Sequence, residues 1–394
     1  MDSLPRPAPM LAALTSLRFF AAAAIVIHHG KNSMAQVLAP FEAMPLGSAV
    51  SLFFVLSGFI LTYVHRGLGR EPSAVRRFYV ARIARLWPAH VATFLLFLLV
   101  IPSAAWFAPG GEILGKEIAA ANLAMVHAWI PIPAFYFSFN GVSWSISAEL
   151  FFYLMFPLLV QKWNATWHWK MLLMICWSFL FALTAERLNA AAYGIENMMK
   201  VTFHGLIYIS PFARIYEFVV GMCAAQAYSW LAPRLRLRPA VWGALEAAAL
   251  YALVAAWPLT SWVIAHGLGS GGGGAMGLFL SQAIPAWAFF FLILVLAMSN
   301  GPLARLLSLR WLVLLGEASY CLYLVHQLIL TGFVFHPSLI AGLSEGARFV
   351  LYAALSVVLA IALWRLVEIP CRRAIIVFSQ REGRSVAPAT PPSV

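Results

Sequence analysis

The chain has 394 residues, of which 62% are hydrophobic and only 10% are charged. Soluble globular proteins are roughly 45–50% apolar and about 25% charged, so this composition excludes a water-soluble enzyme and a disordered chain. Because a spanning helix needs about 20 apolar residues, the length allows about ten spans joined by short loops. The net charge of +12 fits basic residues gathered in cytoplasmic loops, so the expected partner is the lipid bilayer and not nucleic acid.

Apolar runs predict an all-α, polytopic membrane protein with about ten transmembrane helices. The predicted spans cover residues 11–29, 48–65, 88–106, 142–160, 171–188, 206–230, 240–260, 276–298, 311–331 and 347–367. Proline and glycine interrupt the segment 107–141, so we expect no span there, only a short interfacial helix at Gly115–Ile130.

The distribution of basic residues predicts the orientation of these spans. With the N-terminus in the cytoplasm, the inner segments hold 19 Lys and Arg and the outer segments hold 5, as the positive-inside rule requires. An eleventh span at 115–131 would invert everything after it and remove this asymmetry. We therefore expect both termini in the cytoplasm, with a membrane domain at 1–375 and a disordered cytoplasmic tail at 376–394.

The first predicted span carries two ionisable residues, Arg18 and His29. Eleven residues are close to three helical turns, so both lie on one face, about 16 Å apart along the axis. His28 points about 100° away from His29. Ionisable groups inside a bilayer are expensive and mark functional sites. The pattern favours either a channel along this face, or an arginine that snorkels to the inner surface below an interfacial histidine.

Glu149 in the fourth span is expected near the outer side, at a depth similar to that of His29. A carboxylate there can orient an imidazole and support a general base. The alternative is a structural ion pair with Arg214. In the sixth span, Arg214 and Glu217 are interpreted as an ion pair within the membrane.

Two arginines, Arg82 and Arg85, precede the third predicted span with i, i+3 spacing. They share one helical face at the inner membrane surface. Arginine forks suit phosphate oxygens, and contact with lipid headgroups is the alternative. In the ninth span, Tyr320, Tyr323 and His326 form a rough polar stripe with the same spacing.

Seven short motifs follow one another along nearly the whole chain. They read Arg18-x10-His29, Phe53-Phe-Val-Leu-Ser57-Gly-Phe59, Arg82-x-x-Arg85-Leu-x-Pro88, Trp144-Ser145-Ile-Ser-Ala-Glu149, Arg214-x-x-Glu217-Phe-x-x-Gly221, Ser319-Tyr320-x-x-Tyr323-Leu-x-His326 and Glu368-x-Pro370. Each motif alone is weak. In this order and spacing the chain resembles acyltransferase family 3, membrane O-acyltransferases that include acetylases of O-antigen, exopolysaccharide and Nod-factor sugars and acylases of macrolides.

The resemblance implies an acyl-CoA donor, typically acetyl-CoA, that is taken from the cytoplasm. Arg82 and Arg85 would hold its phosphates, and a pantetheine arm of roughly 20 Å would span the distance between Arg18 and His29. The acceptor would be a sugar hydroxyl on a lipid-linked or surface polysaccharide at a bacterial inner membrane. No histidine or cysteine spacing fits a metal site, and no bound cofactor is expected.

The resemblance also implies roles for individual residues. His29 would act as general base on the acceptor hydroxyl, or as a transient acyl carrier. Glu149 would orient His29, and Arg18 would hold the donor or stabilise an oxyanion. The remaining candidates for substrate binding are Ser57, Trp144, Ser145, Tyr320, Tyr323, His326, Arg82 and Arg85.

Three other functions fit some of these features. Within the family, the acceptor could instead be a small secondary metabolite, such as a macrolide, on the cytoplasmic side. A transporter or flippase would also carry intramembrane Arg, His and Glu, although the chain has no internal repeat of the kind that many transporters show. A non-catalytic assembly subunit would tolerate replacement of His29.

Overall fold

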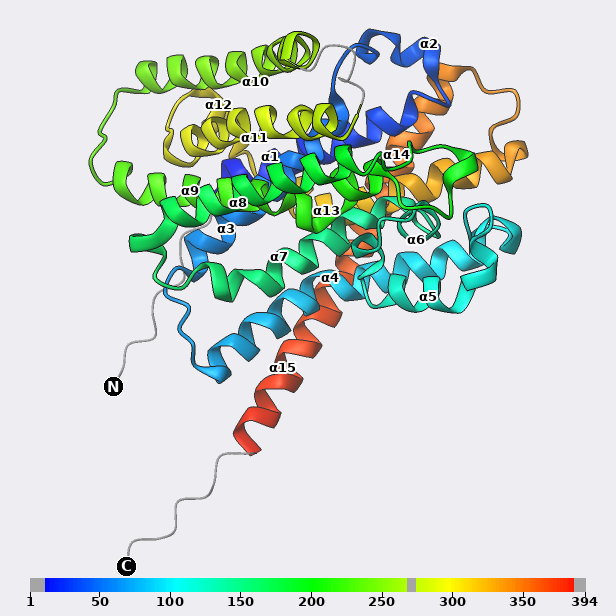
Figure 1. Cartoon of the computed structure of the whole chain (residues 1–394), viewed down its shortest axis with the longest axis horizontal. Coiled ribbons are helices and arrows are strands. Elements are labelled where there is room, and N and C mark those ends of the chain that lie inside the picture. Colours follow the sequence, from blue (N-terminus) through cyan, green and yellow to red (C-terminus); the bar gives the residue numbers. More distant parts are fainter. Residues whose placement is uncertain (1–10, 268–273, 386–394) are drawn as a thin grey trace, which may run out of the picture.

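The computed structural model describes residues 11–267 and 274–385, and helices dominate both ranges (Figure 1). Among the described residues, ten helices are long and apolar enough to cross a membrane. They are α1 (Ala12–Gly30), α3 (Ala49–His65), α4 (Pro72–Val100), α7 (Trp144–Leu159), α8 (Trp163–Arg187), α9 (Pro211–Leu231), α10 (Pro239–Gly267), α11 (Ala275–Met298), α13 (Arg310–Phe335) and α14 (Glu345–Leu363). Each overlaps one predicted span, so the prediction of an all-α polytopic protein is confirmed.

Helix α4 begins well before the predicted span at residue 88. Pro72 occupies its first turn, where a missing N–H costs little, and Pro88 lies inside the helix. Spanning helices tolerate such a proline because neighbouring groups satisfy the freed carbonyl. Arg82 and Arg85 therefore lie on a spanning helix, and hydropathy alone missed its start because polar residues occupy the first turns.

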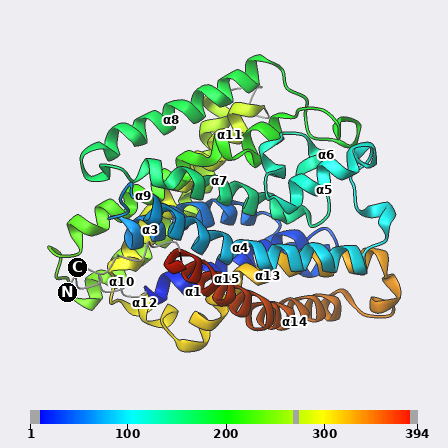
Figure 2. The same cartoon turned by 90° about the horizontal axis from the view of Figure 1, so that it is seen from below.

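Helix α14 also continues past its predicted end. It runs through a π-helical turn, η11 (Trp364–Glu368), into α15 (Ile369–Ser385), which packs along α4 (Figure 2). Residues 376–385 of the expected disordered tail are therefore helical. The rest of that tail, residues 386–394, lies outside the described residues.

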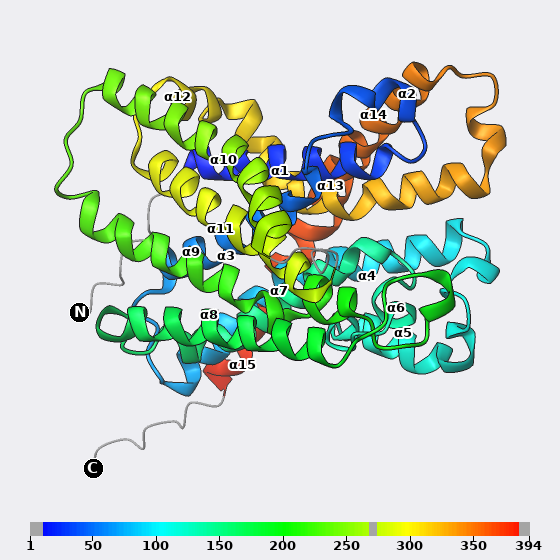
Figure 3. The ribbon, with the colours of Figure 1, turned by 45° about the horizontal axis from the view of Figure 1, so that its top comes forward.

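The segment between α4 and α7 contains short helices and no candidate span, as expected. They are η3 (Ser103–Ala105), η4 (Gly111–Leu114), α5 (Gly115–Leu123), η5 (His127–Trp129), α6 (Pro133–Tyr136) and η6 (Gly141–Ser143), which leads into α7. The helix predicted for 115–130 ends early because Met125 adopts a positive φ of 55°, a conformation that stops helices. Figure 3 shows α5 and α6 gathered beside α4 at one end of the bundle.

This segment is folded into the protein and is not a simple interfacial helix. Phe135 and Phe139 pack against Phe94 and Phe97 of α4 in an apolar cluster of their own. His127 is fully buried, and burial lowers its pKa to about 3. The segment therefore brings a neutral histidine and a packed core up to the start of α7.

Close backbone contacts fix the interior helices. A Cβ on Gly58 of α3 would lie 1.9 Å from the carbonyl oxygen of Phe218 in α9. A Cβ on Gly221 of α9 would lie 1.8 Å from the carbonyl oxygen of Val55. Small residues let spanning helices approach this closely, so α3 and α9 form a tight pair. Figure 1 places α10 at one edge of the bundle, and Figure 2 places α8 at another.

Helices α1 and α13 meet in the same way. A Cβ on Gly316 of α13 would lie 2.0 Å from the carbonyl oxygen of Thr15 in α1. Thr15 is one turn before Arg18, so this contact holds α13 beside the turn of α1 that carries the arginine.

Candidate active site

A cavity of about 630 Å³ opens among α1, α3, α4, α7, α13 and α15. Its lining includes seven of the eleven candidate residues from the sequence: Arg18, Arg82, Arg85, Ser145, Glu149, Tyr320 and Tyr323. The other four, His29, Ser57, Trp144 and His326, lie outside the lining. Helices from both ends of the chain therefore assemble one site.

The cavity is rich in positive charge. Arg372 and Arg373 of α15 join the three predicted arginines in the lining, and the carboxylates there are Glu149 and Glu317. Five arginines thus face two carboxylates. Such an excess attracts anions, and arginine forks match the geometry of phosphate oxygens.

Arg18 faces this cavity from α1. Within the described part of the chain, its guanidinium makes no hydrogen bond or ion pair, although Arg85 and Glu149 lie within electrostatic reach. A guanidinium inside a bundle normally has a partner. Arg18 is therefore available to a ligand that enters the cavity.

The two arginines of α4 differ in their surroundings. Arg85 pairs with Glu368 of η11, and its Cζ lies 5.7 Å from the centroid of the Tyr320 ring. The Cζ of Arg82 lies 5.9 Å from the Tyr153 ring, and its buried Nε has no hydrogen-bond partner in the described ranges. Arg85 is held in place, whereas Arg82 keeps more of its hydrogen-bonding capacity.

Glu149 does not contact His29 as the sequence suggested. Its Oε1 accepts a hydrogen bond of 3.0 Å from Ser57 Oγ and another from the Tyr153 hydroxyl. Its place in the lining beside Arg18 puts it near the arginine end of the first helix. The expectations that Glu149 orients His29 and shares its depth are therefore wrong.

The start of α7 explains this difference. Asn140 Nδ2 donates to the carbonyl oxygen of Leu324 at 2.9 Å, and Ser145 Oγ donates to the Tyr323 hydroxyl at 2.9 Å. Both partners lie in the middle of α13, so α7 begins deep in the bundle. A residue one turn into α7 consequently lies deeper than hydropathy indicated.

His29 has another partner, His326 of α13. The Nδ1 of His29 lies 2.9 Å from the Nε2 of His326, and the two rings are nearly parallel, with 4° between their planes. His326 is fully buried. The polar stripe predicted on the ninth span thus meets the histidine predicted on the first span.

The hydrogen bonds of this pair assign its protons. His326 Nδ1 lies 3.2 Å from the carbonyl oxygen of Leu322, which only accepts, so Nδ1 carries the proton and Nε2 is the acceptor. His29 must then donate from Nδ1. Neutral His29 therefore has an unprotonated Nε2, which is the form that a general base requires.

His28 faces a different part of the molecule. A Cβ on Gly47 would lie 3.4 Å from the Nε2 of His28, so this ring points towards the loop before α3. Of the two neighbouring histidines, His29 is the one that is hydrogen-bonded to His326. This agrees with the choice of His29 over His28 from the helical face of Arg18.

Tyr323 lies between the cavity and the histidine pair. It lines the cavity, and its ring centroid lies 5.6 Å from that of His326. Its hydroxyl donates to the carbonyl oxygen of Val142 at 3.1 Å and accepts from Ser145. The hydroxyl groups of Tyr323 and Ser145 therefore belong to the part of the cavity lining that lies beside His326.

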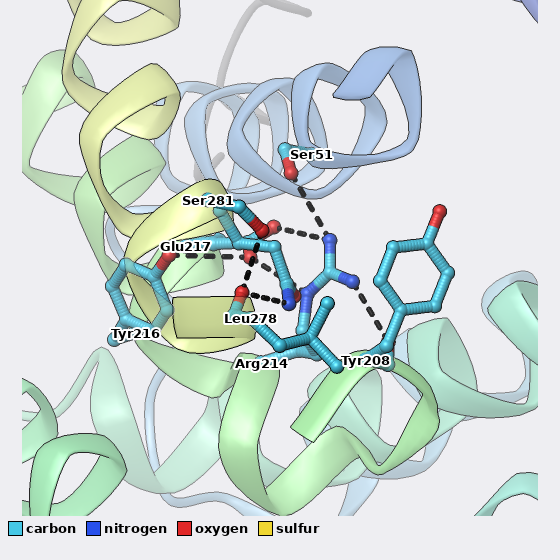
Figure 4. A network of polar contacts seen from close by, with 8 residues as sticks. Ser51, Tyr208, Arg214, Tyr216, Glu217, Leu278 and Ser281 are labelled. Atoms are coloured by element: carbon cyan, nitrogen blue, oxygen red, sulfur yellow. Dashed lines mark hydrogen bonds and ion pairs between the residues drawn. The ribbon is translucent and has the colours of Figure 1, made fainter. Parts of the chain in front are cut away.

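The Arg214–Glu217 pair is structural, as expected. Arg214 donates from Nε and Nη2 to the two carboxylate oxygens of Glu217, and it also donates to Ser51 and to the carbonyl of Tyr208 (Figure 4). Both residues are fully buried. Trp144, a candidate for substrate binding, packs instead on this network, with its ring centroid 6.0 Å from the Arg214 Cζ.

A family model described as an acyltransferase domain matches residues 11–365. The chain belongs to acyltransferase family 3. This match covers all ten spanning helices in full, so it includes every spanning helix that lines the cavity, but it ends before α15.

Two curated relatives of this acyltransferase family 3 chain were found. "Acyltransferase MdmB" of Streptomyces mycarofaciens is 30% identical over 400 aligned residues, which cover 94% of each chain. An uncharacterised protein of Haemophilus influenzae is 27% identical over 186 residues, 45% of this chain and 73% of its own. No solved structure matches the chain.

Several site residues of this family member escaped the sequence analysis. They are Tyr153, Glu317, Arg372 and Arg373 in the cavity lining. Glu368 belonged to a recognised motif, but its pairing with Arg85 depends on how α15 packs. Among the described residues, no group of three or more His, Cys, Asp or Glu side chains could hold a metal ion.

Proposed function

We propose that this membrane acyltransferase moves an acetyl group from cytoplasmic acetyl-CoA to a sugar hydroxyl. The acceptor would be a lipid-linked or surface polysaccharide at the inner membrane of a bacterium. One observation carries the proposal: Tyr323 belongs to the lining of an arginine-rich cavity, and its ring contacts one member of a hydrogen-bonded histidine pair. The arginines suit a phosphorylated donor, and the histidines suit activation of a hydroxyl.

The donor would enter with its acyl end first. Arg82 and Arg85 would hold the phosphates at the mouth, while the pantetheine arm would pass Arg18 and reach Tyr323. This arm is roughly 20 Å long, and Arg18 and His29 are about 16 Å apart along α1. The nucleotide part would then remain at the mouth while the thioester reaches the histidine pair.

His29 would act as the general base. Its Nε2 takes the proton of the acceptor hydroxyl as the oxygen attacks the thioester carbon. Collapse of the tetrahedral intermediate breaks the carbon–sulfur bond, and the proton passes from His29 to the departing CoA sulfur. His326 accepts the Nδ1–H bond throughout, which stabilises the imidazolium that forms in between.

Arg18 would hold the donor and would not stabilise the oxyanion. Its distance of about 16 Å from His29 along the helix is too long for one side chain to reach the reacting carbon. The hydroxyls of Ser145 and Tyr323 lie nearer to His326. Either hydroxyl would donate to the thioester oxygen only after giving up its present bond, Ser145 to Tyr323 or Tyr323 to the Val142 carbonyl.

Mass spectrometry of cell-surface glycans and lipid-linked sugars, from cells with and without the gene, tests this function. We expect one acetyl ester on a sugar hydroxyl only when the gene is present, and its loss when His29 is replaced by alanine. An unchanged glycan together with an acetylated small metabolite would support the alternative acceptor. Unchanged glycans and metabolites in both strains would contradict the acyl-transfer proposal.

A further inference from the structure

Helix α15 contributes one side of the cavity mouth. Ile369, Arg372, Arg373 and Ile376 line the cavity, and all four lie on α15, which packs along α4 (Figure 2). Residues 372 and 376 are one helical turn apart, as are 369 and 373. One face of α15 is therefore turned towards the cavity and shares its lining with the arginines of α4.

Four arginines meet at this mouth with little compensating charge. Arg372 lies within electrostatic reach of Arg85 and Arg82, and the carboxylate within its reach is Glu317. The carboxylate of Glu368 is already paired with Arg85. Clustered like charges repel one another, so such an arrangement is stable when an anion with several negative groups lies between them.

We propose that Arg372 and Arg373 form, with Arg82 and Arg85, a clamp built from two helices for a donor that carries several phosphate groups. The clamp rests on the proposed function and extends it to α15, which lies outside the family match. Acyl-CoA has this chemistry, because it carries a pyrophosphate and a separate 3′-phosphate. Each arginine can bind phosphate oxygens through two parallel N–H groups.

The purified full-length protein in nanodiscs of zwitterionic lipid allows a direct test. Binding of CoA, of 3′-dephospho-CoA and of pantetheine would be measured by calorimetry for the wild type and for the Arg372→Ala/Arg373→Ala double variant. The matched control is Arg381→Ala, because Arg381 is an exposed arginine of the same helix that does not line the cavity.

We expect the double variant to bind CoA about 10- to 100-fold more weakly, the range expected for losing hydrogen bonds to a charged group. The loss should be smaller for 3′-dephospho-CoA and absent for pantetheine, and Arg381→Ala should stay within about twofold of the wild type. Arg372→Lys/Arg373→Lys should fall in between, because lysine keeps the charge without the fork. The lysine variant replaces the alanine variant in this measurement if the alanine variant does not fold.

Unchanged CoA affinity in the double variant would overturn the clamp, as would an equal loss for pantetheine. A second set of nanodiscs with anionic phospholipid separates the donor from a lipid headgroup. If the variant retains less anionic lipid but binds CoA normally, these arginines bind lipid and the clamp is wrong. Failure of the wild type to bind CoA would instead contradict the proposed donor, and the clamp with it.

Discussion

At the scale of single residues, the chemistry of this site depends on where one proton lies. The Leu322 carbonyl can only accept a hydrogen bond, so the proton of His326 is on Nδ1. His29 therefore donates from Nδ1 to His326 and keeps a free lone pair on Nε2. A carboxylate partner, as first expected from Glu149, would fix the same tautomer with a negative charge. The neutral partner fixes it without bringing a charge into the bundle.

Replacing His29 by alanine should reduce acetyl transfer by about 10²- to 10⁴-fold, the usual contribution of a general base. His28→Ala is the matched control and should keep most activity, because His28 points towards Gly47 and does not contact His326. Labelled acetyl transfer would be measured on membranes with equal amounts of each protein. Activity that survives in His29→Ala but not in His28→Ala would contradict the assignment.

Replacing His326 separates positioning from donor binding. His326→Ala removes the acceptor for His29 Nδ1–H, so we expect kcat to fall by roughly 10- to 100-fold, with the KM for the donor nearly unchanged. His326→Gln should recover part of this loss, because its side-chain oxygen can accept the same bond. A loss that appears only in the KM for the donor would show that His326 binds donor instead.

At the scale of helices, glycines decide how closely the interior spans approach. Gly58 and Gly221 place the backbones of α3 and α9 in contact, and Gly316 does the same for α13 and α1. Ser57 directly precedes Gly58 in α3. The close packing of α3 therefore also fixes the position from which the Ser57 hydroxyl donates to Glu149. The motif residues around these glycines therefore serve packing as well as the site.

Gly58→Ala should destabilise the protein strongly, because its Cβ would lie 1.9 Å from the Phe218 carbonyl oxygen, which cannot move aside as a flexible side chain can. Overpacking of this kind costs about 1–3 kcal/mol, and more where backbone must shift. Thermal unfolding in detergent would be compared with Gly67→Ala, whose Cβ would meet no atom within 4 Å. Equal unfolding temperatures for the two variants would contradict the close contact of α3 and α9.

At the scale of the whole molecule, hydropathy predicted the ten spans because each is a long apolar run. It also identified Arg18, Arg82 and Glu149, since charged groups in or beside apolar runs stand out. It could not predict the partner of His29, because His326 is 297 residues away along the chain and the contact depends on how α1 packs on α13. For the same reason Arg372 and Arg373 stood out only as basic residues after the last predicted span, and not as part of the cavity lining.

The arrangement of the site implies a direction for the reaction. The arginine-lined mouth includes α15, and the positive-inside rule predicts that this end faces the cytoplasm. The histidine pair lies beyond Tyr323, towards the other end of α1. Donor and acceptor would therefore approach from opposite sides, and CoA would not have to cross the membrane.

Transfer in sealed vesicles of known orientation tests this central claim most directly. Labelled acetyl-CoA, which does not cross bilayers, would be added outside inside-out and right-side-out vesicles that contain the protein and its acceptor. We expect labelled ester in intact inside-out vesicles, and in right-side-out vesicles only after permeabilisation. Equal transfer by both kinds of intact vesicle, or transfer by intact right-side-out vesicles alone, would contradict a donor site at the cytoplasmic end of the bundle.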